Sequence, residues 1–321
     1  MQIGVFTPVF ARLSFEEMLR EVATYKGITA VELGTGCWPG ASHVDVAALL
    51  ASKEAACAFR ARVRDAGLTI SALSCHGNPI HPDEKIAHEH DAVFRQTIRL
   101  AEALEVPVVV TFSGCPGGSP QDKTPNWVTA AWPPEFAEAL AWQWEEKLIP
   151  YWRSAAKIAS DAGVKVALEA HPGFCVYNPE TMLRLREAAG PSIGMNFDPS
   201  HLWWQGVDIP TAIAALGEAI FHFHAKDVAL NPGMTARNGV LDTKSYSHMQ
   251  QRSWLFRSVG WGHGELDWKR IASALRLIGY DYVMSIEHED ALASIREGLM
   301  AAVEMLSRVV LREPAVEPWW T

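Results

Sequence analysis

Four ionisable residues stand at the ends of four apolar segments in the second half of the sequence. Glu169 closes the segment KVALE, and Asp198 follows IGMNF. His224 lies near the end of IFHFHA, and Glu287 follows YVMSI. Three carboxylates and one imidazole form an oxygen-rich ligand set, which suits Mn²⁺, Mg²⁺ or Co²⁺, while Zn²⁺ accepts the same groups. We therefore expect one bound divalent metal ion, with Mn²⁺ favoured.

The spacing of these residues indicates that separate strands present them at one place. Successive members are about one strand-plus-helix unit apart, and the last interval also holds a long loop. Short apolar runs alternate with amphipathic segments along the chain, which is typical of parallel strands covered by helices. Eight such runs favour a closed (β/α)₈ TIM barrel over an open doubly wound sheet, and barrel active sites lie at the C-terminal strand ends. The predicted strands are Ile3–Thr7, Ala30–Gly34, Thr69–Ser74, Val106–Phe112, Lys165–Ala170, Ile193–Phe197, Ile220–Ala225 and Tyr282–Glu287.

The segments between these strands predict helices and two long loops within a single barrel domain spanning residues 1–321. Ser14 followed by Glu17 resembles a capping box at the start of the first helix. The connections near residues 113–134 and 228–265 both follow strands, so we expect them to overhang the C-terminal rim. The predicted helices are Ser14–Tyr25, Lys53–Ala66, His88–Leu104, Glu135–Asp161, Pro179–Ala189, Asp267–Leu277 and Ser294–Leu311.

The composition of the chain indicates which binding partners and which cellular compartment to expect. The 321 residues are 49% hydrophobic and 20% charged, an ordinary globular balance, and the formal net charge is -9. Because lysine and arginine form no basic stripe, nucleic acid is disfavoured as a partner. The five cysteines are odd in number and form no CxxC pair, which favours reduced thiols and a cytoplasmic protein. We find no signal peptide and no apolar stretch near the ~20 residues of a membrane span, so no membrane partner is expected.

Five motifs resemble those of a known family, namely LEAHPG, NFDPSHLWWQG, HFHAKD, GWGHGELDW and YVMSIEHED. Almost the whole chain resembles the xylose isomerase-like barrels, specifically the sugar phosphate isomerase/epimerase group that includes ketose 3-epimerases and inosose dehydratases. The resemblance implies a metal-dependent sugar isomerase or epimerase. Its metal ligands match Glu169, Asp198, His224 and Glu287.

The resemblance also implies catalytic roles. In the epimerases the two glutamate ligands serve as the acid/base pair, which corresponds here to Glu169 and Glu287. His201, which follows Asp198 in DPSH, matches a histidine beside the metal or the substrate, and we include it among the catalytic candidates. Lys226 matches the lysine of the HxKD pattern in dehydratase-like members, so we expect it to bind substrate. Such an enzyme removes a proton next to a sugar carbonyl and passes through a metal-stabilised enediolate.

Three further residues are candidates for substrate binding. His76 follows the third predicted strand, where it is placed to bind a sugar hydroxyl. His263 lies in the loop that returns over the site, either as a mobile acid/base or as a loop anchor. Trp203 lies two residues after the histidine of DPSH and fits either substrate stacking or core packing. His171 and His288 flank the two glutamate strands, where packing fits them as well as catalysis does.

The same machinery serves a second outcome. The long loops and the segment NGVLDTKSYSHMQQRSWLFRSVGWGHGELDW resemble the larger subunits of C-glycoside deglycosidases, which pair with a small β-rich subunit. Those subunits act on 3-oxo-glycosides, and their reaction also begins with proton loss beside a ketone but ends in elimination of the aglycone. A lyase-type deglycosidase is therefore the alternative function. A small sugar or glycoside is the expected substrate in both cases, and a homo-oligomer and a complex with a small subunit both stay open.

Two other classes are disfavoured. Apurinic-site endonucleases share this barrel but add further histidines, and the DxH pair expected after HAKD is absent here. A non-catalytic scaffold has no use for a cluster of buried carboxylates, because burying them without a cation is costly.

Overall fold

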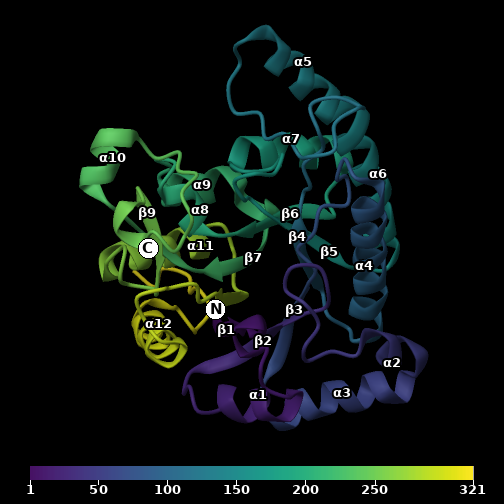
Figure 1. The fold of residues 1–321 in the computed structure, drawn as a ribbon. Coiled ribbons are helices and arrows are strands. Elements are labelled where there is room, and N and C mark those ends of the chain that lie inside the picture. The colour runs from purple at the N-terminus through teal and green to yellow at the C-terminus, as the bar shows by residue number, and fades with distance from the viewer. Residues whose placement is uncertain (321) are drawn as a thin grey trace.

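The computed structural model describes residues 1–320 as an eight-stranded parallel barrel ringed by helices (Figure 1). The strands close in the order β1-β10-β7-β6-β5-β4-β3-β2, and all neighbouring pairs are parallel. The predicted (β/α)₈ barrel is therefore confirmed. The barrel strands are β1 (Gln2–Phe6), β2 (Ile28–Gly34), β3 (Thr69–Ser74), β4 (Val108–Phe112), β5 (Lys165–Glu169), β6 (Ile193–Phe197), β7 (Ile220–Ala225) and β10 (Val283–Ile286).

Amphipathic helices cover the outside of the barrel, and each buries an apolar face against the strands or its neighbours. The first of them begins at the predicted capping box, where the Glu17 N–H donates to Ser14 Oγ and the Ser14 N–H donates to the Glu17 carboxylate. The larger outer helices are α1 (Phe15–Val22), α3 (Lys53–Asp65), α4 (Glu84–Ala103), α6 (Ile149–Asp161), α7 (Pro179–Ala189), α9 (Ile209–Leu216), α11 (Glu265–Leu277) and α12 (Ile295–Val309).

The region predicted as one helix, Glu135–Asp161, contains a π-helical turn. Three pieces follow one another along the chain, namely α5 (Pro134–Trp142), η2 (Gln143–Leu148) and α6. Pro150 lies at the start of α6 and explains the change, because it has no N–H to donate and its ring needs room in the preceding turn. A wider π turn supplies that room.

The interior of the barrel is apolar towards the N-terminal ends of the strands and polar towards their C-terminal ends. The apolar layer is a cluster of Ala72, Val108, Val110, Ala167 and Phe221. The polar layer consists of fully buried side chains that include Glu32, Ser74, Asn196, His222 and His224. This polar layer supports the rim where barrel active sites lie.

The long connection after β7, predicted as a loop over residues 228–265, is largely folded. Its elements are β8 (Asp227–Leu230), α10 (Pro232–Asn238), η4 (Met249–Gln251) and β9 (Trp254–Arg257), with β8 and β9 antiparallel. The Trp254 ring stacks on Trp204 with ring centroids 5.0 Å apart. Trp204 is the C-cap residue directly after the short helix α8 (Pro199–Trp203). We call the antiparallel pair of β8 and β9 the ribbon. The two tryptophan rings, together with Val228 and Phe256, form an apolar cluster of their own beside the barrel core.

The other long connection, residues 113–134, forms no helix or strand before α5 begins. It is held against the barrel at its start, where Trp152 Nε1 of α6 donates to the Ser113 carbonyl at 2.8 Å. No helix within residues 1–320 combines the length and the apolarity needed to cross a bilayer. All five cysteines are free thiols, as the sequence predicts.

Candidate metal centre

The four predicted metal ligands meet at the C-terminal rim, and we call them the rim cluster: Glu169, Asp198, His224 and Glu287. They come from the ends of β5, β6, β7 and β10, and one ligand atom of each lies within 4.8 Å of the others. His224 Nδ1 is 3.2 Å from a Glu169 oxygen and 3.0 Å from a Glu287 oxygen. Four consecutive barrel strands therefore aim metal-competent atoms at one point.

Several atoms at this point are buried and lack hydrogen-bond partners within the described residues. They are Asp198 Oδ2, His201 Nε2, His224 Nδ1 and Glu287 Oε2. Buried polar atoms are nearly always paired, and a buried carboxylate without compensation is costly. A divalent cation at the centre would satisfy all of them together, and an oxygen-rich set with one or two imidazoles is a suitable donor set for it. The residues present thus fit a metal ion.

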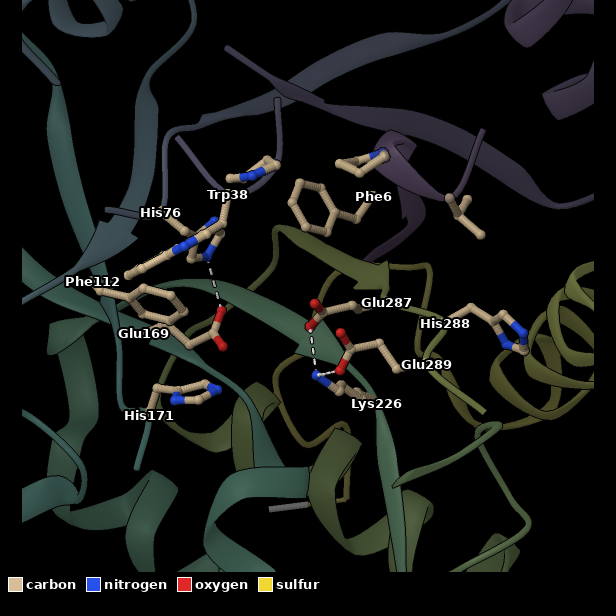
Figure 2. A pocket seen from close by; sticks show the side chains of 13 residues that line it. Phe6, Trp38, His76, Phe112, Glu169, His171, Lys226, Glu287, His288 and Glu289 are labelled. Atoms are coloured by element: carbon tan, nitrogen blue, oxygen red, sulfur yellow. Dashed lines mark hydrogen bonds and ion pairs between the residues drawn. The ribbon is translucent and has the colours of Figure 1, made fainter. Parts of the chain in front are cut away.

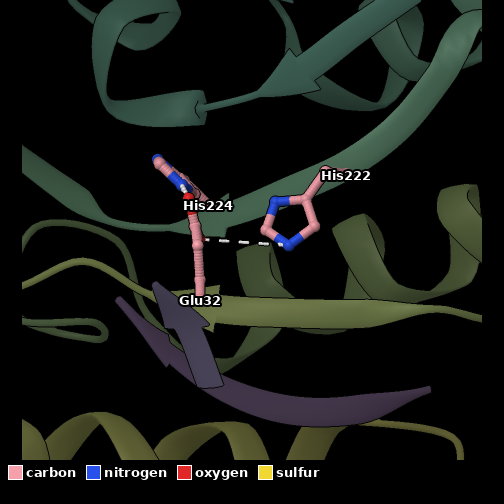
Figure 3. Close-up of side chains that lie close together, drawn as sticks. All are labelled: Glu32, His222 and His224. Atoms are coloured by element: carbon pink, nitrogen blue, oxygen red, sulfur yellow. Dashed lines mark hydrogen bonds and ion pairs between the residues drawn. The ribbon is translucent and has the colours of Figure 1, made fainter. Parts of the chain in front are cut away.

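The orientation of His224 is set by a residue that the sequence analysis did not single out. Both oxygens of Glu32, on β2, lie 3.0 Å from His224 Nε2 (Figure 3). Glu32 also accepts hydrogen bonds from Ser285 and Ser74. A proton on Nε2 directed at Glu32 leaves the Nδ1 lone pair facing the rim cluster. Burial alone would raise the pKa of Glu32, but the charges of His224 and His222 outweigh it and hold that pKa well below its usual range. The sequence feature that could have pointed to Glu32 is a carboxylate inside the otherwise apolar run TAVELG.

Glu169 is the most crowded member of the rim cluster. Its Oε2 accepts from Asn196 Nδ2 at 3.0 Å and lies 3.1 Å from His76 Nε2, while its Oε1 is 3.2 Å from His201 Nε2. Burial would raise the pKa of Glu169, but contacts with His201, His224 and His76 outweigh burial and place it well below its ordinary value. Glu169 is therefore an ionised carboxylate at neutral pH.

Glu287 and Lys226 form the other side of the site. Lys226 Nζ lies 3.3 Å from Glu287 Oε2 and 3.8 Å from Asp198 Oδ2, and it also pairs with Glu289 (Figure 2). Burial opposes charge on both groups, but the charges of Lys226 and His224 hold the pKa of Glu287 at about 2. Burial would lower the pKa of Lys226, which Glu287 and Glu289 instead keep well above its usual value. Burial raises the pKa of Asp198 to about 6.

Glu169, Glu287 and Lys226 form the floor of a rim cavity of about 350 Å³, in the size range of small-molecule sites. Figure 2 shows Glu169 beside His76 and Phe112, with Glu287 apart from it beside Lys226. The remaining walls are mainly aromatic or apolar and include Phe6, Val9, Trp38, Pro39 and His171. Burial and the nearby His201 lower the pKa of His171 to about 3, so it is neutral.

Two predicted substrate-binding residues lie together elsewhere. Trp203 and His263 stack with ring centroids 3.7 Å apart and planes 8° apart. His263 Nδ1 is 2.8 Å from Asp227 Oδ1, and the second oxygen of Asp227 accepts the His263 backbone N–H. Within residues 1–320 neither ring is among the side chains that line the cavity, whereas His76 and Lys226 are. A substrate contact by Trp203 or His263 stays a prediction.

A closed parallel barrel with buried carboxylates and imidazoles at its C-terminal rim defines the general class. The chain belongs to the family of xylose isomerase-like TIM barrels, which matches residues 19–308. Proteins that share this fold include epimerases and inosose dehydratase-like proteins. The resemblance predicted from the motifs is thus confirmed at the level of the family.

Three similar proteins illustrate the extent of the likeness. The chain is 40% identical to Uncharacterized protein YfiH of Bacillus subtilis (strain 168) over 313 residues, which cover 97% of this chain and 99% of that protein. A D-tagatose 3-epimerase-like protein has a solved structure with a TM-score of 0.64 and 20% identity, over 96% of this chain and 97% of the other. The IOLI protein with a bound zinc atom has a TM-score of 0.63 and 20% identity, over 97% and 98%. At such identity the two structures establish a shared fold alone.

Proposed function

We propose that the protein is a divalent-metal-dependent sugar isomerase or epimerase that removes a proton from the carbon next to a carbonyl group. One observation carries the proposal. Buried ligand atoms of Asp198, His224 and Glu287 have no hydrogen-bond partner in the described chain and lie within 4.8 Å of one another, and Glu169 and Glu287 of the same cluster line a cavity sized for a small molecule.

The rim cluster would hold the cation. Its three carboxylates and one imidazole favour Mn²⁺, with Mg²⁺ and Co²⁺ as close alternatives. Zn²⁺ is the remaining candidate, since the IOLI protein that shares this fold holds a zinc atom. A bound divalent cation supplies a Lewis acid that polarises the sugar carbonyl and lowers the barrier to proton loss beside it.

Glu287 and Glu169 form the proposed acid/base pair. Both line the cavity, from β10 and β5, and both have a lowered pKa, so each is a carboxylate able to take up a proton. Glu287 is the better base for the first step, because its side chain is 15% exposed to the cavity while that of Glu169 is 3% exposed. Epimerisation requires a proton to return on the opposite face, so the ionised Glu169 would first take up a proton from a substrate hydroxyl or water and then deliver it to the carbon.

His76, Lys226 and His201 are proposed to position the substrate. His76 Nδ1 is buried without a partner in residues 1–320, so it is available to a sugar hydroxyl. The Lys226 ammonium lines the cavity and can donate to a hydroxyl or carbonyl oxygen. His201 Nε2 lies 3.2 Å from Glu169 and 3.3 Å from Asp198, where it can hold both carboxylates in place or bind substrate.

Elimination from a 3-oxo-glycoside is the second candidate. It needs the same base and the same cation, and it is favoured by a second, mainly apolar cavity that adjoins the rim cavity and shares His171 and Glu289 with it. A free ketose has no substituent to place there.

The test is solvent-deuterium exchange followed by NMR, with the Mn²⁺-loaded protein and a matched panel of free ketoses and 3-oxo-glycosides. Deuterium at the carbon beside the carbonyl, together with a new epimer or isomer, is the result expected of an isomerase. Release of an aglycone while the ketoses stay unlabelled would replace it with the lyase. No exchange into any member of the panel, from protein with verified metal content, would refute both.

A further inference from the structure

A second cavity opens beside the rim cavity described above, which we call the metal cavity from here on. The two cavities share two lining residues, His171 and Glu289. The volume of the second cavity is about 410 Å³, slightly more than that of the metal cavity. Apart from the two shared residues its lining is Tyr246, Met249, Leu255, Phe256, Ala291 and Leu292. We call this second space the apolar compartment. Its chemistry differs from that of the metal cavity, whose floor consists of ionised groups.

Phe256 is the side chain that joins the two spaces. Its ring lies 4.2 Å from Lys226 Nζ, and the His201 ring meets it edge-on at 5.4 Å between centroids. On the other side Tyr246 stacks on the same ring at 5.7 Å and 17°. The Phe256 ring therefore lies between Lys226, which lines the metal cavity, and the second cavity, which Phe256 itself lines.

The walls of the apolar compartment come from two segments outside the barrel proper. Leu255 and Phe256 belong to β9, and Tyr246 precedes it in the folded connection after β7. Leu292 belongs to the segment after β10, close in sequence to Glu287. Tyr246 and Leu292 are 54% and 57% exposed, although both are large and apolar enough to gain from burial. Such a surface beside a polar site is typical of a place for the apolar part of a ligand.

We propose that the substrate is a sugar bearing an apolar, ring-containing substituent, with the sugar in the metal cavity and the substituent in the apolar compartment. The inference rests on the proposed function in placing the sugar on the rim cluster. A free ketose carries polar groups on its whole length and would leave the exposed side chains of Tyr246 and Leu292 in water. A glycoside with an aromatic aglycone would cover them, and its aglycone would pass between His171 and Glu289.

The experiment compares two ligands that differ in the substituent alone, phenyl β-D-glucopyranoside and methyl β-D-glucopyranoside, by calorimetric titration of the Mn²⁺-loaded protein. The phenyl glycoside is expected to bind about tenfold more tightly, because burying a ring removes a large apolar area from water. Leu292→Ser and Tyr246→Ala should each reduce that advantage to about threefold or less. Both positions are exposed, so neither change should prevent folding. Leu266→Ala is the matched control, since Leu266 lies on α11 and is 63% exposed.

Equal affinities, or no binding of the phenyl glycoside, would overturn the inference. Sedimentation of the same variants tests whether a second copy of the chain covers this surface. A change of mass in Leu292→Ser without a change in ligand preference would also overturn it. The deuterium-exchange assay separates the two proposals. Exchange without a phenyl advantage removes this inference alone, and a phenyl advantage without exchange into any substrate removes the proposed chemistry alone.

Discussion

Two clusters of histidine and carboxylate side chains meet at His224, and they differ in how their polar atoms are paired (Figure 3). In the inner cluster of Glu32, His222 and His224, both Glu32 oxygens accept hydrogen bonds. His222 is also paired, at 2.9 Å to Asn196 Oδ1 and 3.4 Å to Ser71 Oγ. In the rim cluster, buried atoms of Asp198, His224 and Glu287 have no hydrogen-bond partner in the described chain, although Lys226 Nζ lies 3.3 Å from Glu287 Oε2 and 3.8 Å from Asp198 Oδ2. Judged by residue types alone, both clusters would be candidate metal sites. They differ in whether the individual polar atoms already have hydrogen-bond partners in the protein.

The two clusters therefore have different roles. The inner cluster holds its members with hydrogen bonds and presents one nitrogen of His224 outwards. The rim cluster leaves buried atoms without hydrogen-bond partners, where a cation could bind, and its members Glu169 and Glu287 line the cavity. Asn196 connects them, because it accepts from His222 and donates to Glu169 at 3.0 Å. We expect changes in the rim cluster to remove catalysis, and changes in the inner cluster to weaken metal binding.

The largest effect should follow from Glu287→Gln. The amide has the shape of the carboxylate but cannot take up a proton, so we expect turnover to fall by about 10³-fold or more. The measurement is the initial rate of proton exchange, with metal content determined on the same sample. Glu304→Gln on α12 is the matched control, because its side chain is 71% exposed and lies outside the cavity. Full metal content together with wild-type activity in Glu287→Gln would show that the acid/base assignment is wrong. Glu169→Gln should give a similar loss.

Metal removal should have the next largest effect. We expect EDTA to inactivate the protein by about 100-fold or more and Mn²⁺ or Co²⁺ to restore it, since the cation supplies the Lewis acid. The thermal midpoint should also rise by about 5 °C when Mn²⁺ is added to the metal-free protein, because the cation binds the folded chain alone. Undiminished activity after verified removal of metal would rule out the mechanism. An unchanged midpoint would argue against a buried cation site.

Glu32→Gln tests the inner cluster directly. Loss of the carboxylate that orients His224 should weaken Mn²⁺ binding by about 10- to 100-fold, while turnover at saturating Mn²⁺ falls much less. Titration of Mn²⁺ followed by its paramagnetic resonance gives the affinity. His222→Asn provides the comparison within the cluster, and it should change the affinity by about threefold or less, because His222 does not face the rim. An equal loss of Mn²⁺ affinity in the two variants would show that Glu32 has no greater part than His222 in orienting His224.

The barrel and the position of the rim cluster could be predicted from the sequence because buried parallel strands have distinct boundaries. The predicted bounds Thr69–Ser74, Ile193–Phe197 and Ile220–Ala225 agree with β3, β6 and β7. Each segment carries apolar residues that pack in the core, and it ends where the strand leaves the core. A charged residue directly after such a run has one place to go, which is the rim. This is why Asp198 and Glu287 could be placed from spacing alone.

What the sequence did not predict depends on contacts across the closed barrel. Glu32 and His224 are 192 positions apart, and only closure of the barrel brings β2 and β7 to face each other through its interior. The ribbon of β8 and β9 was predicted as a loop for a related reason. Its strands have four residues each and are stabilised by distant rings such as Trp204, so no local periodicity reveals them.

The smallest expected effect concerns pH and the metal-free protein. Burial raises the pKa of Asp198 from its ordinary 3.8 to about 6, so the folded chain binds this proton more tightly than the unfolded chain. The resulting stability is present below about pH 4 and is lost as pH rises through about 6. The lowered pKa values of Glu169 and Glu287 act at lower pH, below about 4.5, and the raised pKa of His224 acts above about 6.5. The interval between pH 4.5 and 6.5 therefore isolates Asp198 among the rim cluster.

Urea unfolding of metal-free wild type and Asp198→Asn at pH 4.5, 5.5 and 6.5 measures this contribution. The free energy of unfolding of the wild type, relative to the variant, should fall by about 2 kcal/mol over the interval, because the buried carboxylate must ionise without a cation beside it. Taking the difference removes other titrating groups, which both proteins share. Saturating Mn²⁺ should abolish the decline in the wild type, because the cation stabilises the ionised form. A parallel pH dependence in the two metal-free proteins would mean that Asp198 is already compensated without metal, and the contrast between the rim cluster and the inner cluster would then disappear.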